Sequence, residues 1–258
     1  MDLVDAFILG VVEGVTEFLP ISSTGHLILV SDWLGLDQTT SHIAFEIVIQ
    51  FAAIMAIFTS YLEKFHPRHA LLWCKIFVSF LPIAIVGLAF KEQIPVLFEN
   101  FLTVPVMFII GGIVLMWIDD VHNYEPHPTS SIDDVTFRQA AYIGLAQVFA
   151  LIPGTSRAGS TIVGAILVGL DRRTSAEFSF LLALPVLGAT SVFQLVGNYS
   201  ALVDTQIGNL AVGMIAAFIA AWMSMRFFVR YLESHKLAAF GVYRIIVGIV
   251  LMGFYAVA

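Results

Sequence analysis

The sequence is poor in charge and in cysteine. Charged residues make up only 12% of its 258 residues, against roughly 25% in soluble domains. The 12 Lys and Arg are outnumbered by 19 Asp and Glu and form no basic block, which argues against a nucleic-acid partner. The single cysteine, Cys74, cannot form an internal disulfide. No Lys or Arg precedes Lys64, so a cleavable signal peptide is not expected.

Long apolar runs take the place of charge. Hydrophobic residues make up 59% of the chain, and the mean hydropathy is +0.92. Six runs are long enough to cross a bilayer, which takes about 20 helical residues. We therefore predict an all-α polytopic membrane protein. The predicted spans are residues 43–62, 71–90, 104–118, 178–196, 210–228 and 240–256.

Two further apolar stretches are interrupted. Pro20 stops the first and Pro153 stops the second, and a hydroxyl-rich loop and a second short helix follow each proline. Non-helical backbone at membrane depth is tolerated only where it is buried in protein or lines a wet cavity. We therefore predict two re-entrant helix–loop–helix pairs, residues 5–34 and 137–170.

The two interrupted stretches resemble each other. Aligning their prolines pairs Ser23 with Ser156 and brings Gly35–Asp37 within one residue of Gly169–Asp171. Matched interrupted segments in two halves indicate a site at a repeat interface.

We accordingly predict two inverted-topology repeats, residues 1–118 and 135–258. Each is a re-entrant pair plus three transmembrane helices, and a polar cytoplasmic connector, residues 119–134, joins them. Most Lys and Arg then fall on one face, which the positive-inside rule makes cytoplasmic. Both termini and the opening of the first loop would lie outside.

Glu13 and Glu17 stand four residues apart, so on a helix they share one face. Surface acids at the headgroup interface are the alternative, but their neighbours are apolar, and an ionised pair there needs a counter-charge. Carboxylate oxygens suit a hard divalent cation, Mg²⁺ or Ca²⁺. The pair is therefore our candidate metal site.

Both loops have the chemistry of an anion cradle. Each presents glycines, hydroxyl donors and a helix N-terminus, whose free amides and dipole attract negative charge. Arg157 begins the second short helix, and its planar fork suits two phosphate oxygens. Helix capping alone would explain one hydroxyl, not three in a row. The predicted substrate-binding residues are Ser22, Thr24, Gly25, Gly154, Thr155, Ser156 and Thr161.

Two other polar residues stand out. A lone histidine is more often structural, but His26 lies beside the serines and glutamates, which makes it a candidate proton carrier. Arg244 lies in the last span and is expected to pair with an acid that neutralises its buried charge.

The stretches GVVEGVTEFLPISSTGH and PGTSRAGST closely resemble the two signature motifs of the bacterial undecaprenyl-diphosphate phosphatase family, membrane enzymes linked to bacitracin resistance. The resemblance continues through FEIVIQ, SAEFSFLLALP and YR, and so covers most of the chain. It departs at Ala158, where the family commonly has serine, so a hydroxyl there is not essential.

The resemblance implies hydrolysis of the terminal phosphate of undecaprenyl diphosphate in the bacterial cytoplasmic membrane, with a divalent metal requirement. It places the family's catalytic set on Glu13, Glu17, Ser23, His26 and Arg157. We expect Ser23 to attack phosphorus, Glu17 or His26 to take its proton, and Arg157 to stabilise the charge. Direct attack by water stays open.

Other functions fit parts of the sequence. A carrier that moves the lipid phosphate between leaflets shares the inverted repeat and the broken helices, but the gathered serine, glutamate and histidine exceed what binding needs. A membrane scaffold would not account for the paired breaks. The oligomeric state, including a homodimer, is left open.

Overall fold

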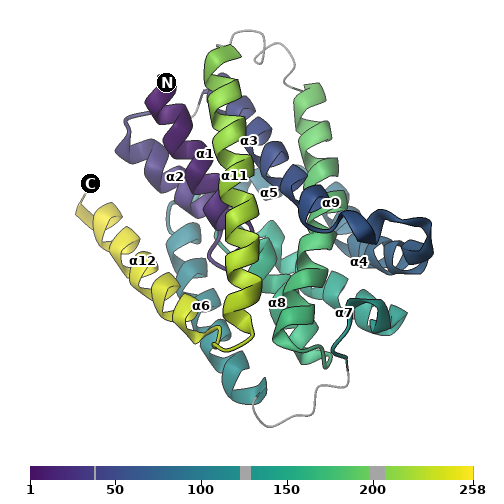
Figure 1. The fold of residues 1–258 in the computed structure, drawn as a ribbon. Coiled ribbons are helices and arrows are strands. Elements are labelled where there is room, and N and C mark those ends of the chain that lie inside the picture. The colour runs from purple at the N-terminus through teal and green to yellow at the C-terminus, as the bar shows by residue number, and fades with distance from the viewer. Residues whose placement is uncertain (38, 123–128, 198–206, 258) are drawn as a thin grey trace. The chain divides into compact units, whose positions relative to one another are not determined.

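The structure is a computed structural model that describes residues 1–37, 39–122, 129–197 and 207–257. These residues form helices joined by short turns (Figure 1). The α-helices are α1 (Leu3–Glu17), α2 (Ser23–Trp33), α3 (Thr40–Ser60), α4 (Ala70–Ala89), α5 (Ile94–Glu99), α6 (Thr103–His122), α7 (Phe137–Gln147), α8 (Arg157–Leu167), α9 (Arg172–Gly197), α11 (Ile207–Leu232) and α12 (Ala238–Val257). Short 3₁₀ helices are η1 (Leu62–Phe65), η2 (Pro67–His69), η3 (Ile132–Asp134) and η4 (Val148–Leu151).

The chain is an all-α polytopic membrane protein, as predicted. Within the described residues, five helices are long and apolar enough to cross a bilayer: Thr40–Ser60, Pro67–Ala89, Thr103–Asp120, Arg172–Gln194 and Ile207–Leu232. The sixth predicted span corresponds to α12, whose apolar stretch Ala238–Phe254 is shorter. The apolar runs did not indicate α5.

The residues group into two compact units. Unit 1 comprises Met1–Leu19, Ser23–Phe65 and Ala183–Phe227, and unit 2 comprises Pro20–Ser22, His66–Leu182 and Phe228–Ala258. Each unit draws on both halves of the chain, and α9 and α11 each contribute residues to both units. The division into inverted repeats stays a prediction.

In unit 1, α1 packs against α2 and α3 and approaches α11 through small residues. A Cβ on Gly10 would lie 2.5 Å from the carbonyl oxygen of Gly213, and one on Gly14 would clash with the carbonyl oxygen of Ala217. Because hydrocarbon offers no hydrophobic drive, such close backbone contact is how membrane helices gain packing energy.

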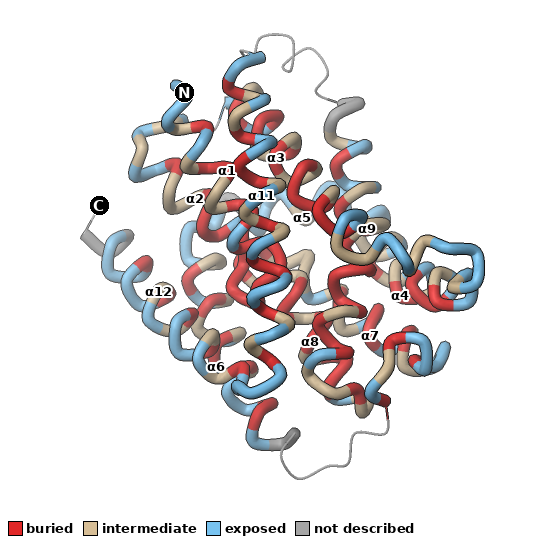
Figure 2. The backbone as a smooth tube through the Cα atoms, in the orientation of Figure 1, coloured by how far each residue is buried: buried red, intermediate tan, exposed pale blue. Residues whose placement is uncertain are grey.

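In unit 2, α12 lies along α6 and α4 packs against α7 (Figure 1). Buried residues recur on α12 at spacings of three and four, at Gly241, Arg244, Gly248 and Leu251, while most of its remaining surface is exposed (Figure 2). A Cβ on Gly241 would lie 2.6 Å from the carbonyl oxygen of Gly112. One narrow stripe of α12 therefore holds it to α6.

Asp119 departs from the predicted solvated connector. It lies in α6, is 2% exposed, and its Oδ1 accepts a hydrogen bond of 3.0 Å from Arg172 Nε. Its Oδ2 accepts from the Ala238 amide at 2.6 Å, so it caps α12. The carboxylate is buried because it satisfies a guanidinium and a free helix-end amide together. Residues 123–128 of the connector lie outside the described residues.

Candidate functional site

Two breaks interrupt the short helices. The first break, residues 18–22, separates α1 from α2, and the second break, residues 152–156, separates η4 from α8. The short helices flanking each break pack against each other. Both predicted helix–loop–helix pairs are therefore present, and the second short helix of the first pair begins at Ser23.

Each break ends on a serine with an unusual backbone. Ser22 has φ of 72° and Ser156 has φ of 77°, and they are the two non-glycine residues with positive φ in the described chain. This conformation costs an L-residue about 1–2 kcal/mol. The Ser156 Oγ accepts a hydrogen bond of 3.0 Å from the Gly159 amide and so caps α8. Strain of this kind concentrates at functional sites.

The helix starts correct the register of the two breaks. The proline alignment paired Ser23 with Ser156, but the positive-φ residues pair Ser22 with Ser156, and the first helical residues pair Ser23 with Arg157. The prolines mislead because they sit at different positions within breaks of equal length. The first helical position is therefore a serine in one break and an arginine in the other.

The first break holds a hydroxyl against a carboxylate. Ser23 Oγ donates a hydrogen bond of 2.6 Å to Glu17 Oε2, and Ser23 and Glu17 are only 7% and 6% exposed. A hydrogen bond this short to a carboxylate is a strong one. The pair has the geometry of a nucleophile and its general base.

Other predicted residues of the first break lie on the same two helices. Glu13 is fully buried one turn before Glu17, and His26 is 8% exposed. Gly25 is buried, whereas Thr24 is exposed. Glu13, Glu17, Ser23 and His26 all belong to unit 1.

The second break positions Arg157, in unit 2. Arg157 Nη1 donates to the carbonyl oxygen of Ser179 at 2.9 Å and to its Oγ at 3.2 Å. The Oγ of Ser179 also lies 2.6 Å from Thr161 Oγ1, which donates to the Arg157 carbonyl at 2.9 Å. Ser179, on α9, thus anchors the guanidinium. Ser179 was not predicted as a site residue, although it lies between two phenylalanines in the stretch SAEFSFLLALP that carries the family resemblance.

The other predicted residues of the second break are placed by tight packing. Gly154 has φ of 88°, and a Cβ there would lie 2.8 Å from the carbonyl oxygen of Val104, so only glycine fits. Thr155 is half-buried and Thr161 is fully buried. Their role in binding substrate stays a prediction.

The expected acid partner of Arg244 is wrong. Its guanidinium donates to backbone carbonyl oxygens instead, on α6 and on both breaks. Three of these carbonyls lie at the breaks, where they lack the amide partners that a continuous helix would supply, and the other two, of Met107 and Phe108, lie on α6.

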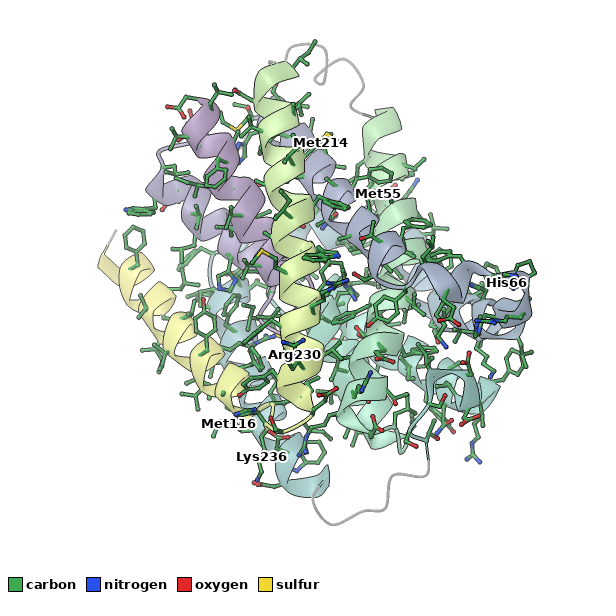
Figure 3. All side chains as sticks on the ribbon, in the orientation of Figure 1. Met55, His66, Met116, Met214, Arg230 and Lys236 are labelled. Atoms are coloured by element: carbon green, nitrogen blue, oxygen red, sulfur yellow. The ribbon has the colours of Figure 1, made fainter. Side chains whose placement is uncertain are left out.

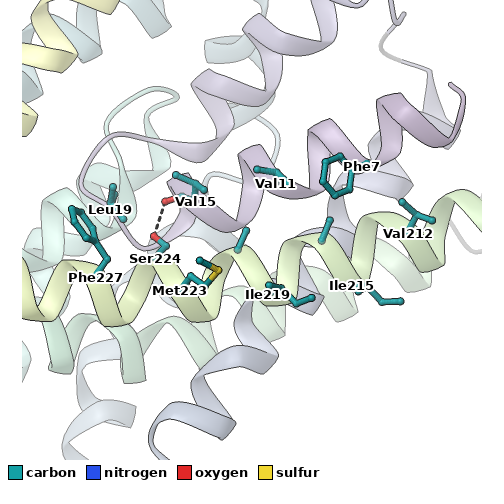
Figure 4. Close-up of a pocket in the computed structure, with 12 residues that line it drawn as sticks. Phe7, Val11, Val15, Leu19, Val212, Ile215, Ile219, Met223, Ser224 and Phe227 are labelled. Atoms are coloured by element: carbon teal, nitrogen blue, oxygen red, sulfur yellow. Dashed lines mark hydrogen bonds between the residues drawn. The ribbon is translucent and has the colours of Figure 1, made fainter.

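An apolar groove of about 710 Å³ lies between α1 and α11 in unit 1 (Figure 4). Val11 and Val15 line it from α1, Leu19 lines it from the first break, and Ile219 and Met223 line it from α11. The hydrogen bond drawn there joins Ser224 Oγ to the Val15 carbonyl at 2.8 Å. This face of α1 is opposite the glutamates, because residues two apart on a helix point in nearly opposite directions. The acids therefore face away from the apolar groove.

The fold and the two breaks define a polytopic α-helical membrane protein with a serine–carboxylate pair at one helix break and an anchored arginine at the other. The family described as Bacitracin resistance protein BacA matches residues 6–250. The chain belongs to the BacA family, as the sequence motifs predicted.

Curated relatives match nearly the whole chain. Undecaprenyl-diphosphatase 2 of Pseudoalteromonas translucida is 47% identical, over 98% of each chain. Undecaprenyl-diphosphatase of Sulfurimonas denitrificans is also 47% identical, over 99% of this chain and 100% of the relative. Undecaprenyl-diphosphatase of Methanococcus aeolicus is 44% identical over 99% of each chain.

Proposed function

We propose that this protein is an integral-membrane phosphatase that hydrolyses the terminal phosphate of undecaprenyl diphosphate to give undecaprenyl phosphate and inorganic phosphate. The observation that carries this proposal is the 2.6 Å hydrogen bond from Ser23 Oγ to Glu17 Oε2. Hydrolysis needs a base beside the attacking hydroxyl, and Glu17 occupies that position. The transporter alternative is not favoured, because the curated relatives that match the whole chain are undecaprenyl-diphosphatases.

The chemistry follows from this pair. Ser23 Oγ attacks the terminal phosphorus, its proton passes to Glu17, and the bond to the bridging oxygen breaks, so that the lipid monophosphate leaves. Water then attacks the phosphoserine and gives a proton to His26, while Glu17 returns its proton to Ser23 Oγ as the phosphorus–Oγ bond breaks, which releases phosphate and restores Ser23. Direct attack by water on the substrate would need the same base but would form no phosphoserine.

Arg157 stabilises the charge that develops on the phosphoryl oxygens. Its Nη1 is anchored by Ser179, which holds the planar fork in one orientation before substrate binds. In this chemistry the serine supplies the attacking oxygen and the arginine supplies the positive charge.

The metal site proposed at Glu13 and Glu17 has the right donors for Mg²⁺. Both carboxylates are buried and stand one helical turn apart on α1. In the described part of the chain, no cluster of three or more His, Cys, Asp or Glu side chains could hold a metal. Two carboxylates suffice when waters and phosphate oxygens complete the shell, as is usual for Mg²⁺. A bound cation would offset the repulsion between the carboxylates and the diphosphate.

We place the protein in the bacterial cytoplasmic membrane with its site open to the periplasmic side. Arg230 and Lys236, at the end of α11 and just beyond it (Figure 3), are among the basic residues that the positive-inside rule assigns to the cytoplasm. In a Cys74→Ala background, we expect Lys236→Cys to be protected from an impermeant maleimide in intact cells and Asp2→Cys to be labelled. The reverse pattern would overturn the sidedness.

Phosphate release from detergent-solubilised protein tests the function. We expect release from a long-chain prenyl diphosphate, its loss in the presence of a chelator, and a drop of about 100-fold or more in Glu17→Gln and Arg157→Ala. Glu233→Gln, which removes an exposed acid that binds Arg173, is the matched control and should retain activity. If the wild type releases no phosphate without a bilayer, the phosphatase proposal fails and the carrier gains support.

A further inference from the structure

Arg244 is the most deeply buried cation in the described residues. It is 1% exposed and lies on the narrow stripe of α12 that faces α6. Its Nε donates to the Phe108 carbonyl at 3.3 Å and its Nη2 to the Met107 carbonyl at 2.8 Å. These bonds fix the guanidinium against α6.

The remaining donors of Arg244 bind both breaks. Nη2 donates to the Gly154 carbonyl at 2.9 Å, and Nη1 donates to the Thr155 carbonyl at 2.9 Å and to the Pro20 carbonyl at 3.0 Å. Pro20 belongs to the first break, and Gly154 and Thr155 belong to the second break. All of these residues lie in unit 2. A single side chain therefore joins the first break to the second.

The surroundings are built to receive the guanidinium. Gly111 leaves the space that it fills, because a Cβ there would clash with Arg244 Nη2. The guanidinium carbon lies 5.4 Å from the centre of the Phe108 ring, which adds a cation–π contact. The five N–H donors of a guanidinium point outward in one plane and can reach carbonyl oxygens that surround it, whereas a lysine has three donors on a single atom.

We propose that Arg244 is a positioning residue for the phosphatase reaction, which holds Pro20 of the first break in register with Gly154 and Thr155 of the second break. The inference rests on the proposed function. A displacement of about 1 Å in catalytic groups can cost about 100-fold in rate. Loss of the guanidinium should therefore lower kcat by about that factor and change KM little, because the donors that bind the ground state remain.

The first experiment replaces the guanidinium. Arg244→Lys and Arg244→Met are compared with Arg172→Met, which removes a mostly buried arginine of unit 2 that binds Asp119 instead of the breaks. We expect kcat to fall about 100-fold in both Arg244 variants. Hydrogen exchange of backbone amides in residues 18–25 and 152–160 should become about tenfold faster. Arg172→Met should leave exchange in both breaks unchanged.

A second variant displaces Arg244 without removing it. Gly111→Ala puts a methyl group where Nη2 lies, and Gly253→Ala, with nothing near its Cβ, is the matched control. We expect Gly111→Ala to accelerate exchange at both breaks, and to add little in an Arg244→Met background because both changes remove the same contacts. This variant keeps the test decisive if Arg244→Met does not fold.

Two results would overturn the inference: a folded Arg244→Met protein with kcat within about threefold of wild type, or unchanged exchange at both breaks in Gly111→Ala. The exchange measurement needs no substrate. Failure of the phosphatase proposal, seen as no phosphate release by the wild type, is therefore distinguishable from failure of the Arg244 proposal.

Discussion

The two breaks share a backbone and differ in chemistry. Each is five residues long and ends on a buried serine with positive φ, Ser22 or Ser156. The next residue begins a helix, and here the two breaks differ. Ser23 donates a hydrogen bond to Glu17, and Arg157 donates one to the Ser179 carbonyl. The same backbone arrangement therefore carries the proposed nucleophile and base beside the first break and a cation beside the second.

This difference suits phosphate hydrolysis, which has two chemical requirements. Attack on a phosphate requires an oxygen that loses its proton, and the attacked group requires a positive charge to balance its oxygens.

The largest effect is expected from Ser23→Ala, which removes the proposed nucleophile. Phosphate release should fall by about 1000-fold or more, since loss of one member of a nucleophile–base pair removes the whole unit. Ser31→Ala removes another buried hydroxyl from α2, one that bonds His42, and should retain activity. Rapid turnover by Ser23→Ala would rule out the serine nucleophile and leave direct attack by water.

Arg157→Lys should cost about 100-fold in kcat, because a lysine keeps the charge but loses the planar fork. Ser179→Ala tests the anchor by itself: it keeps Arg157 and the Ser179 carbonyl but removes the hydroxyl at 3.2 Å. We expect a smaller loss, about threefold to tenfold, from the second variant. If both variants lose the same factor in kcat, the orientation that Ser179 gives to Arg157 matters more than the planar shape of the guanidinium.

Ser156→Ala and Ser156→Gly probe the shared backbone. The alanine loses the cap to the Gly159 amide and keeps the positive φ, so the free energy of unfolding should fall by about 1 kcal/mol. The glycine loses the same cap but is at ease with positive φ, so its change should stay within about 0.5 kcal/mol. Denaturant-induced unfolding in detergent measures both. If the two breaks are built alike, Ser22→Gly should likewise be milder than Ser22→Ala.

The spans, the helix breaks and the buried acidic face were predictable, because each depends on residues close together in the sequence. Apolar runs located the spans, Pro20 and Pro153 located the breaks, and the spacing of Glu13 and Glu17 placed both acids on the buried face of one helix. Arg157 does begin its helix. The positive φ of Ser22 and Ser156 was not predictable, because serine does not ordinarily adopt that conformation.

Contacts between distant residues were not predictable in the same way. Arg244 donates to the carbonyl of Pro20, 224 residues away in the chain. Its partners are backbone atoms, which every residue has, so the sequence cannot indicate which of them bind it. Arg157 reaches Ser179 on another helix, 22 residues on. The expected acid partner of Arg244 was wrong because backbone carbonyls of α6 and of both breaks accept from its guanidinium instead.

The smallest effects concern how each pair of short helices is held to its neighbour. Ser224 Oγ on α11 donates to the Val15 carbonyl on α1 at 2.8 Å, and Ser79 Oγ on α4 donates to the Ala140 carbonyl on α7 at 2.6 Å. Hydrogen bonds between membrane helices contribute about 0.6 kcal/mol on average, so each serine-to-alanine change should lower the free energy of unfolding by about that amount. The two losses should add in the double variant, because the bonds share no partner. A Cβ on Gly144 of α7 would clash with the Ser79 backbone, so α4 and α7 have little room to adjust there. A loss several times larger for Ser79→Ala than for Ser224→Ala would therefore show that the contact between α4 and α7 depends more on its hydrogen bond than the contact between α1 and α11 does.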